Sequence, residues 1–381
     1  MRFKVLNSWF LLIFMSIYSC GQETKNKIIV ENTGTSNYLE KVVSLKWDQV
    51  LPHLQDITVE NFKIINSKTN QEIPYQIEKL GGETPENLLV QVSLKAGEMM
   101  ELRFLNEPHG PFKIRTYGRY VPERYDDFAW ENDKIGFRTF GKALEKVPNQ
   151  NANGFDVWVK RTDTLIIDKR YARGKYHQEH GDGLDYYKVG LTLGAGNCAP
   201  YVNDSIWYSK NYTDWKLLDN GPLRTTFTLT YDYWNVDGIE LKASKTISLD
   251  AGSQLNKITV KYSDRNKSSG NIALAVGIVK RPQESFELMD EEQGILGYWE
   301  PTHGEDGTTG VGIIFASKAD DMKLEDGQFL AIKTIPLNEP FVYFTGAAWD
   351  KAGKITNHNQ WFNYLKAQRE HIQHNNIIVR Y

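Results

Sequence analysis

Hydrophobic and polar residues alternate along several long segments of this chain, a pattern typical of β-strands that bury one face. The clearest case covers residues 224–260. In its first half apolar and aromatic residues occupy every second position, namely Phe227, Leu229, Tyr231 and Tyr233. An Asp237-Gly238 pair, typical of a tight hairpin turn, precedes a returning segment with the same alternation at Ile239, Leu241 and Ala243. The pattern predicts long antiparallel strands in a broad sheet.

Shorter apolar segments of the same kind predict further strands on both sides of this hairpin. Those within residues 28–106 are closely spaced and predict a small β-sandwich. The Pro- and Gly-containing segment 106–111 marks a boundary. Beyond it, the segments 271–280, 310–316, 329–335 and 341–349 predict a large β-sandwich over residues 111–381. The chain is therefore expected to be all-β, a large antiparallel β-sandwich preceded by a small one. Helices are few, and the credible one carries the stripe Trp361, Phe362, Leu365 and Ile372.

The N-terminus indicates the cellular compartment. Arg2 and Lys4 precede a short apolar segment, 11–17, that ends at small residues before Cys20. This pattern predicts a signal peptide over residues 1–19, and it resembles a bacterial lipoprotein box with Cys20 as the lipid anchor. Residues 20–27 are then a tether. The chain is expected to cross the inner membrane and to reside in the periplasm or as an outer-membrane lipoprotein; an ordinary signal peptide with a chance cysteine is the alternative.

Composition limits the classes of function. The net charge of −3 gives no indication of a nucleic-acid-binding surface, so no nucleic-acid partner is expected. Aromatic residues make up 12% of the chain, as in many secreted β-proteins that bind sugars, although aromatic side chains also fill β-cores. If Cys20 carries lipid, Cys198 is the one remaining cysteine, which excludes an intramolecular disulfide and thiolate-rich metal sites. Cys198 is interpreted as a packing residue.

The segment 173–196 has the highest density of chemically active side chains. Two histidines, two carboxylates, one lysine and three tyrosines surround a Gly-rich turn: His177, His180, Asp182, Asp185, Lys188, Tyr176, Tyr186 and Tyr187. Burying such groups without partners is costly, so their concentration favours a site that moves protons or holds an anion. The alternative is a polar surface loop. The spacing of His177 and His180 also leaves a divalent metal possible, with Asp185 or His303 as a further ligand, although no cofactor is predicted.

Two further segments supply candidate binding residues. Residues 117–138 contain Arg119 and Arg138, which could hold the carboxylate of an acidic sugar, and Glu131 and Asn132, which could face a cleft. The alternative is that these arginines pair with acidic neighbours in the same segment. The polar loop 298–307 contributes Trp299 and His303. We therefore predict Arg119, Arg138, Glu131, Asn132, Trp299 and His303 as substrate-binding residues.

At these segments the chain resembles a bacterial family, long labelled a domain of unknown function, that occurs in polysaccharide-utilisation gene clusters. The resembling residues are 122–124, Asp127, 130–133, 137–138, 158–161, 176–177, Gly181, Gly183, Asp185 and 187–190. The resemblance implies a galactose-mutarotase-like sandwich. It also implies an ulvan oligosaccharide dehydratase activity, the removal of water from a non-reducing-end uronic acid to leave a 4,5-unsaturated uronate. Phe140 and Ala195 depart from the family pattern, where Tyr and Cys are expected.

That reaction requires a base for the proton on C5, an acid for O4 and a cation beside the carboxylate. We assign His177 or His180 as base, Tyr187 as acid or its partner, and Lys188 and Arg119 as the cations; His303 is an alternative acid. The expected partner is an acidic oligosaccharide, with a membrane reached through the lipid anchor. A polysaccharide lyase, a glycoside hydrolase and a non-catalytic surface sugar-binding lipoprotein are the competing interpretations.

Overall fold

The computed structural model describes residues 26–59, 61–148, 152–266 and 269–381. The predicted signal peptide (1–19), Cys20 and most of the tether (20–27) lie outside the described residues, so these assignments stay predictions. No helix in the described ranges has the length and apolar character needed to cross a membrane.

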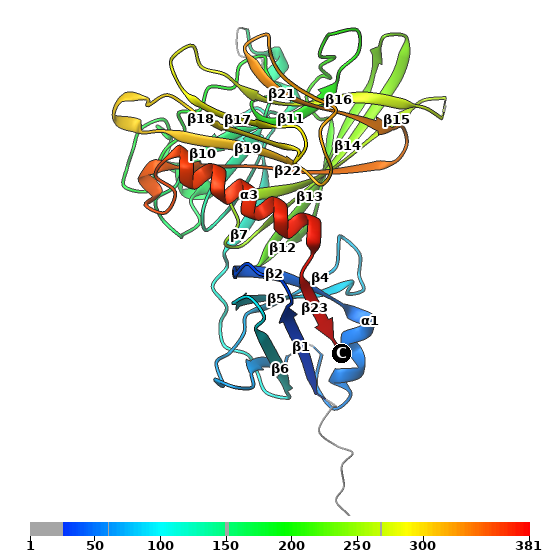
Figure 1. Ribbon diagram of the computed structural model, residues 1–381, viewed down its shortest axis with the longest axis vertical. Coiled ribbons are helices and arrows are strands. Elements are labelled where there is room, and N and C mark those ends of the chain that lie inside the picture. The colour runs from blue at the N-terminus through cyan, green and yellow to red at the C-terminus, as the bar shows by residue number, and fades with distance from the viewer. Residues whose placement is uncertain (1–25, 60, 149–151, 267–268) are drawn as a thin grey trace, which may run out of the picture.

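Two β-sandwiches form the molecule, the small one beneath the large one in Figure 1. In the small sandwich a four-stranded sheet of order β23-β1-β6-β3 faces a three-stranded sheet of order β2-β5-β4. The strands are β1 (Lys27–Asn32), β2 (Tyr38–Lys46), β3 (Lys63–Asn66), β4 (Tyr75–Glu78), β5 (Asn87–Leu94), β6 (Met99–Leu105) and β23 (Ile377–Arg380). Aliphatic and aromatic side chains of both sheets fill the space between them.

The last strand corrects one predicted boundary. Residues 111–381 were expected to form the large sandwich, but β23 pairs with β1 and completes a sheet of the small sandwich. The physical reason is that Ile377 and Val379 of β23 pack against the hydrophobic core of the small sandwich. The chain therefore begins and ends in the same small unit within the described residues.

The large sandwich has an eight-stranded antiparallel sheet of order β12-β13-β14-β15-β22-β19-β18-β17. Its strands are β12 (Asp214–Asn220), β13 (Arg224–Val236), β14 (Ile239–Asp250), β15 (Leu255–Asp264), β17 (Phe286–Asp290), β18 (Ile295–Trp299), β19 (Thr309–Phe315) and β22 (Pro340–Trp349). Two four-stranded sheets, β10-β9-β8-β7 and β11-β16-β21-β20, form the opposing layer. They contain β7 (Thr116–Val121), β8 (Asp127–Asn132), β9 (Gly136–Thr139), β10 (Asp156–Trp158), β11 (Ala195–Pro200), β16 (Asn271–Val279), β20 (Asp321–Glu325) and β21 (Gln328–Pro336).

The predicted hairpin at residues 224–260 is confirmed with one correction. Asp237 and Gly238 both have positive φ, 48° and 86°, as the tight turn between β13 and β14 requires. A register irregularity between Tyr231 and Trp234 interrupts the pairing of the two strands. Because a shift of one residue reverses the direction of a strand side chain, Tyr233 is exposed rather than buried.

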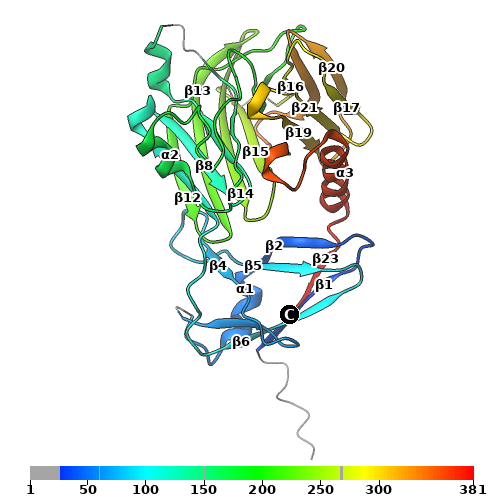
Figure 2. The ribbon, with the colours of Figure 1, turned by 90° about the vertical axis from the view of Figure 1, so that its left-hand side faces the viewer.

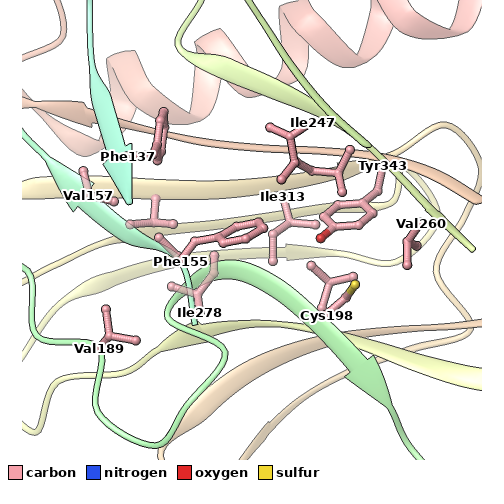
Figure 3. Close-up of a cluster of buried hydrophobic side chains, with 14 of the residues drawn as sticks. Phe137, Phe155, Val157, Val189, Cys198, Ile247, Val260, Ile278, Ile313 and Tyr343 are labelled. Carbon is pink, nitrogen blue, oxygen red and sulfur yellow. The ribbon is translucent and has the colours of Figure 1, made fainter. Parts of the chain in front are cut away.

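The core lies between the two layers of the large sandwich. Figure 3 shows Phe137, Phe155 and Val157 from one layer meeting Ile247, Ile313 and Tyr343 from the other. Cys198 is buried in the same cluster, as its interpretation as a packing residue predicts. The all-β prediction, with two sandwiches and few helices, is confirmed.

Three α-helices are present in the described residues: α1 (Trp47–Val50), α2 (Ile167–Arg173) and α3 (His358–His374). Short 3₁₀ turns are η1 (Leu51–Leu54), η2 (Pro122–Arg124), η3 (Lys142–Lys146), η4 (Gly304–Asp306) and η5 (Asp350–Ala352). The side chain of Asn357 caps α3 by accepting the Gln360 N–H at 3.1 Å. The predicted stripe is confirmed, because Trp361 and Leu365 are buried against the large sheet. In Figure 2, α3 lies at one side of the large sandwich and leads down to β23.

Candidate active site

A buried charge cluster lies on the outer face of the β7–β10 sheet. The inner face of this sheet supplies Phe128, Trp130 and Phe137 to the core, so the alternate residues point the other way. Arg138 in β9 lies directly opposite Asp156 in β10. Asp127 of β8 and Asp185 of the segment after α2 also approach this guanidinium. We call Asp127, Arg138, Asp156 and Asp185 the Arg138 cluster.

The guanidinium of Arg138 lies within ion-pair distance of all three carboxylates of the cluster. Arg138 donates to Asp156 through Nε at 3.0 Å and through Nη2 at 2.6 Å, and Nη2 also donates to Asp185 at 3.0 Å. An oxygen of Asp127 lies 3.6 Å from Nη1. None of the four side chains is more than 5% exposed. Trp158 and Tyr176 place their rings beside the guanidinium and help to exclude water.

Three carboxylates around one buried arginine cannot all be charged at little cost. Burial raises the pKa of Asp127 and of Asp185 to about 6, with Arg138 opposing the shift in both. Burial and the nearby Asp185 raise the pKa of Asp156 to about 7. The same carboxylates outweigh the effect of burial on Arg138 and hold its pKa above the usual value. The raised pKa values therefore favour a proton on part of the cluster near neutral pH.

His177 lies at the solvent side of the Arg138 cluster. Its Nδ1 is 2.8 Å from the backbone oxygen of Asp185 and 3.5 Å from the Asp185 carboxylate. A carbonyl oxygen only accepts hydrogen bonds, so Nδ1 carries the hydrogen and, in the neutral ring, Nε2 carries the lone pair. The side chain is 65% exposed. His177 is thus an oriented imidazole whose basic nitrogen is accessible.

His180 has a different environment. It is exposed, and its Nε2 lies 3.3 Å from the backbone oxygen of Lys175. The two histidines therefore do not share a ligand position. In the described part of the chain, no group of three or more His, Cys, Asp or Glu side chains is arranged to hold a metal ion. The geometry accordingly favours His177 over His180 as the base, and the predicted base role of His180 gains no structural support.

A second buried group surrounds Glu300, which directly follows β18. Arg281 donates from Nε to Glu300 Oε1 at 2.6 Å, and His303 Nε2 lies 3.6 Å from Glu300 Oε2. Burial raises the pKa of Glu300 to about 7, and Arg281 opposes this shift. Burial, and then the charge of Arg281, lower the pKa of His303. We call Arg281, Glu300 and His303 the Glu300 cluster. Glu300 Oε2 and His303 Nε2 form no hydrogen bond with each other, and the raised pKa favours a proton on the Glu300 carboxyl near neutral pH.

Residues 185–188 connect the two clusters. Asp185 contacts Arg138 and His177, while the ring of the next residue, Tyr186, lies 5.0 Å from the ring of His303. The Tyr186 hydroxyl is 2.5 Å from that of Thr309. His177 therefore contacts Asp185, and His303 contacts the next residue, Tyr186.

Tyr187 is not available as an acid, which corrects its predicted role. Its side chain is buried in the core, and its hydroxyl donates to the backbone oxygen of Gly194 at 3.0 Å. Burial raises its pKa well above the usual value, and the charge of Glu300 adds to the shift. Lys188, by contrast, is exposed and close enough to His303 for its charge to lower the pKa of that ring. Lys188 remains a candidate cation beside the site.

Both arginines predicted as substrate clamps are paired within the protein. Arg119 donates to Glu123 and to Asp168, each at 2.6 Å, and Arg138 forms the buried cluster described above. Arg138 is inaccessible, so its predicted direct binding of substrate is contradicted. The internal pairing that the acidic neighbours suggested is the arrangement observed.

Three other predicted binding residues are buried in structural roles. Glu131 receives the Lys160 ammonium at 2.6 Å and the backbone N–H groups of Ile166 and Ile167 at the start of α2. Asn132 donates to the backbone oxygens of residues 250 and 253. Trp299 packs in the cluster beneath α3. These assignments are corrected, because each side chain stabilises a neighbouring element and none faces solvent.

Sequence reasoning missed Asp156, Arg281 and Glu300. Asp156 stands in a three-residue strand, too short for its alternation with Val157 to be recognised. Glu300 lies in the loop that was singled out for His303, and its acidity next to a buried strand was the available signal. Arg281 follows β16 and carried no local signal, because its partners are distant in the sequence.

A model of the family described as "Domain of unknown function (DUF4861)" matches residues 30–377. The chain belongs to the DUF4861 family. The chain is also similar to the uncharacterized protein P7 of Formosa agariphila. The two are 32% identical over 269 residues, which are 66% of this chain and 67% of the relative. The DUF4861 match covers both sandwiches, so the small unit is part of the family's architecture.

Two solved structures from Enterococcus faecalis resemble this DUF4861 protein in fold. One is a protein in glycosyl hydrolase family 38, with a TM-score of 0.51 and 9% identity, covering 93% of this chain and 47% of that one. The other is an alpha-mannosidase, with a TM-score of 0.52 and 8% identity, covering 93% and 46%. The chain spans about half the length of both. The likeness confirms the predicted galactose-mutarotase-like fold class.

The Arg138 cluster yields a stability prediction. Replacing Arg138 with Met removes the one cation that contacts all three carboxylates, and loss of one partner from a buried ion pair costs about 3–5 kcal/mol. Arg119→Met, a matched change at more exposed pairs, is expected to cost no more than about 1 kcal/mol. Urea unfolding of the two variants measures the difference. Equal destabilisation would contradict the structural role of Arg138.

A pH prediction follows from Asp156. Its pKa is raised on folding, to about 7, so the folded protein binds this proton more tightly than the unfolded chain. The contribution of this carboxyl to stability is present at about pH 4 and is lost as the pH rises to about 7. The Asn side chain of the Asp156→Asn variant is uncharged at every pH. The free energy of unfolding of this variant minus that of the wild type should therefore increase from about pH 4 to about pH 7. Unfolding curves at several pH values test this; a constant or decreasing difference would argue against it.

The control for this experiment is Asp182→Asn, because its carboxylate is shifted in the opposite direction. Arg173 and Lys169 outweigh the effect of burial and lower the pKa of Asp182 to about 2. Its stabilising effect is present above the unfolded pKa and is lost as the pH falls through the folded one. Over pH 4–7 the Asp182 variant should therefore show no increase of the kind expected for Asp156→Asn.

Proposed function

We propose that this DUF4861 protein is a carbohydrate-active carbon–oxygen lyase that eliminates water from a non-reducing-end uronic acid of an ulvan-type oligosaccharide. The observation that carries the proposal is the orientation of His177. Its Nδ1 is committed to the backbone oxygen of Asp185, which leaves Nε2 free as a base. The nearby Asp185 carboxylate is placed to stabilise the imidazolium that forms when Nε2 takes a proton.

The elimination balances without a redox partner. His177 Nε2 removes the proton from C5, the electrons of that bond form the C4–C5 double bond, and the C4–O4 bond breaks. O4 takes a proton and departs as water. The Glu300 cluster is the proposed source of that proton, because the pKa of Glu300 is raised to about 7 and the neighbouring His303 is partly exposed.

The C5 proton becomes acidic enough only when the adjacent carboxylate is neutralised. Lys188 is the proposed cation. It is exposed, lies close to His303, and has no ion-pair partner among the residues that the structure describes. Arg119, the other cation predicted for this purpose, is already held by two carboxylates and is the weaker candidate.

The fold of the solved relatives also raises glycoside hydrolysis as a possible chemistry. Hydrolysis of that kind uses two carboxyl groups on opposite sides of an accessible bond. In this chain Asp127, Asp156 and Asp185 converge on one guanidinium and are at most 2% exposed. This arrangement supports elimination by an exposed histidine better than hydrolysis by this carboxylate group.

The proposal is tested with His177→Gln and, as its matched control, His180→Gln. Removing a general base lowers the rate about 10²–10⁴-fold, so the His177 variant should lose formation of the ultraviolet-absorbing unsaturated uronate. The His180 variant should keep activity near that of the wild type. Initial rates on a panel of uronic-acid oligosaccharides give the comparison. Full turnover by the His177 variant would exclude the assignment.

Product mass separates dehydration from chain cleavage in the same reactions. A dehydratase product is lighter than the substrate by one water and keeps its chain length, whereas a polysaccharide lyase gives shorter chains. A sugar-binding protein without catalytic activity would bind the panel and change neither mass nor absorbance. Cleaved chains would overturn the dehydratase proposal and leave the elimination chemistry in place.

A further inference from the structure

A large cavity lies between the two sandwiches, away from the residues described above. Its volume is about 780 Å³, within the range typical of ligand sites. One wall is the outer face of β13, β14, β15 and β22 in the large sheet. The others are β2, β4, β5 and β23 of the small sandwich and the C-terminal part of α3. The cavity shares no residue with the Arg138 or Glu300 clusters.

The wall from the large sheet is polar and rich in hydroxyl groups. Along β14 the apolar residues point into the core, so Thr246 and Ser248 point to the cavity. They pair across to hydroxyl groups of β13, and Thr259 of β15 also lines the wall. A polar sheet face usually contacts open solvent. Here the small sandwich packs against one end of that face, where Val42 and Leu89 meet Leu223 and Ala251. The cavity beside this contact leaves room for a polar ligand over the hydroxyl groups.

Positive charge exceeds negative charge on the cavity wall. The cationic side chains that line it are Lys41, Lys46, Arg224 and Lys257, and the carboxylates are Glu78 and Asp250. Both carboxylates are taken by Arg224, which lies 2.5 Å from Asp250 and 3.2 Å from Glu78. Lys41 and Lys257 have no ion pair within the described ranges.

The two unpaired lysines line the same cavity, one from each sandwich, and their charges interact. Lys41 is exposed at the cavity, but the surrounding protein partly desolvates its ammonium and lowers its pKa. Asp250 opposes that shift, and the charges of Arg224 and Lys257 add to it. The charge of Lys41 in turn contributes to the lowered pKa of His371 on α3, after the larger effect of burial. Like charges held together in a partly enclosed space are costly unless an anion binds between them. Phe344 adds an aromatic surface to the same wall.

We propose that this cavity binds an acidic sugar, with Lys41 and Lys257 holding its carboxylate or sulfate group and the threonine and serine hydroxyls of β13–β15 contacting its hydroxyl groups. The site is separate from the proposed catalytic residues and does not depend on their function. A sugar bound there contacts strands of both sandwiches and α3.

The experiment uses the mature chain with Lys41→Met and Lys257→Met combined, in the His177→Gln background so that the ligand is not consumed. A matched control combines Lys142→Met and Lys318→Met, which removes the same charge at exposed positions. Calorimetric titration with tetragalacturonic acid should show affinity reduced about tenfold or more in the first variant, since a charge-assisted hydrogen bond is lost at each lysine. The control should bind as the parent does.

Two further titrations identify the ligand chemistry. A sulfated carrageenan tetrasaccharide reports whether sulfate or carboxylate is preferred, and uncharged cellotetraose should bind weakly in every variant. Equal affinity of parent and double-lysine variant for both acidic sugars would overturn the proposal, as would binding of cellotetraose as tightly as the acids. Circular dichroism confirms that the variants are folded.

Activity measurements distinguish the test of this binding site from the test of the proposed function. With His177 restored, the double-lysine variant should retain catalytic activity on the uronic-acid panel, because the cavity and the catalytic residues are separate. Loss of activity without loss of fold would show that the cavity is the reaction site and would overturn the separation. Inactivity of the wild type would refute the catalytic proposal alone, because the binding comparison does not use turnover.

Discussion

The burial of Arg138 among three carboxylates is the interaction on which the rest of the site depends. Its guanidinium joins β8, β9 and β10 on the outer face of their sheet and reaches the irregular segment 174–188 through Asp185. Desolvation is costly for every member, and the arrangement persists because each charge has a partner. This pairing gives a segment without regular secondary structure a defined position, and with it the ring of His177.

Three consecutive residues of that segment contact different parts of the site. Asp185 faces the Arg138 cluster, Tyr186 faces His303, and Tyr187 enters the core beneath Arg281. Consecutive residues thereby connect His177, the proposed base, to one buried acid group and lie beside His303 of the other, the proposed proton source. Both acid groups have carboxyl pKa values raised toward neutrality by burial, the environment in which proton transfer at pH 7 is efficient.

The sequence predicted the sandwiches better than the site. Period-two alternation identified β13, β14 and the strands of the small unit, because one-sided burial is a local pattern. Pairing of β23 with β1 joins residues about 350 apart and leaves no local trace. Likewise the concentration of polar groups at 173–196 located the important segment. The sequence did not show that His177 is exposed and Tyr187 buried. It also did not show that Arg138 and Glu131 pair with groups of the protein itself. The role of each of these residues depends on its partners in the folded protein, and those partners are not its neighbours in the sequence.

The tautomer of His177 is the most direct test of the central claim, because the chain's proposed base exists only if the Asp185 backbone oxygen holds the Nδ1 hydrogen. Nitrogen chemical shifts of ¹⁵N-labelled histidine, recorded at alkaline pH and assigned with His177→Gln, distinguish the two neutral forms. The account predicts hydrogen on Nδ1 and a free lone pair on Nε2. Hydrogen on Nε2, or an equal mixture of both forms, would contradict it.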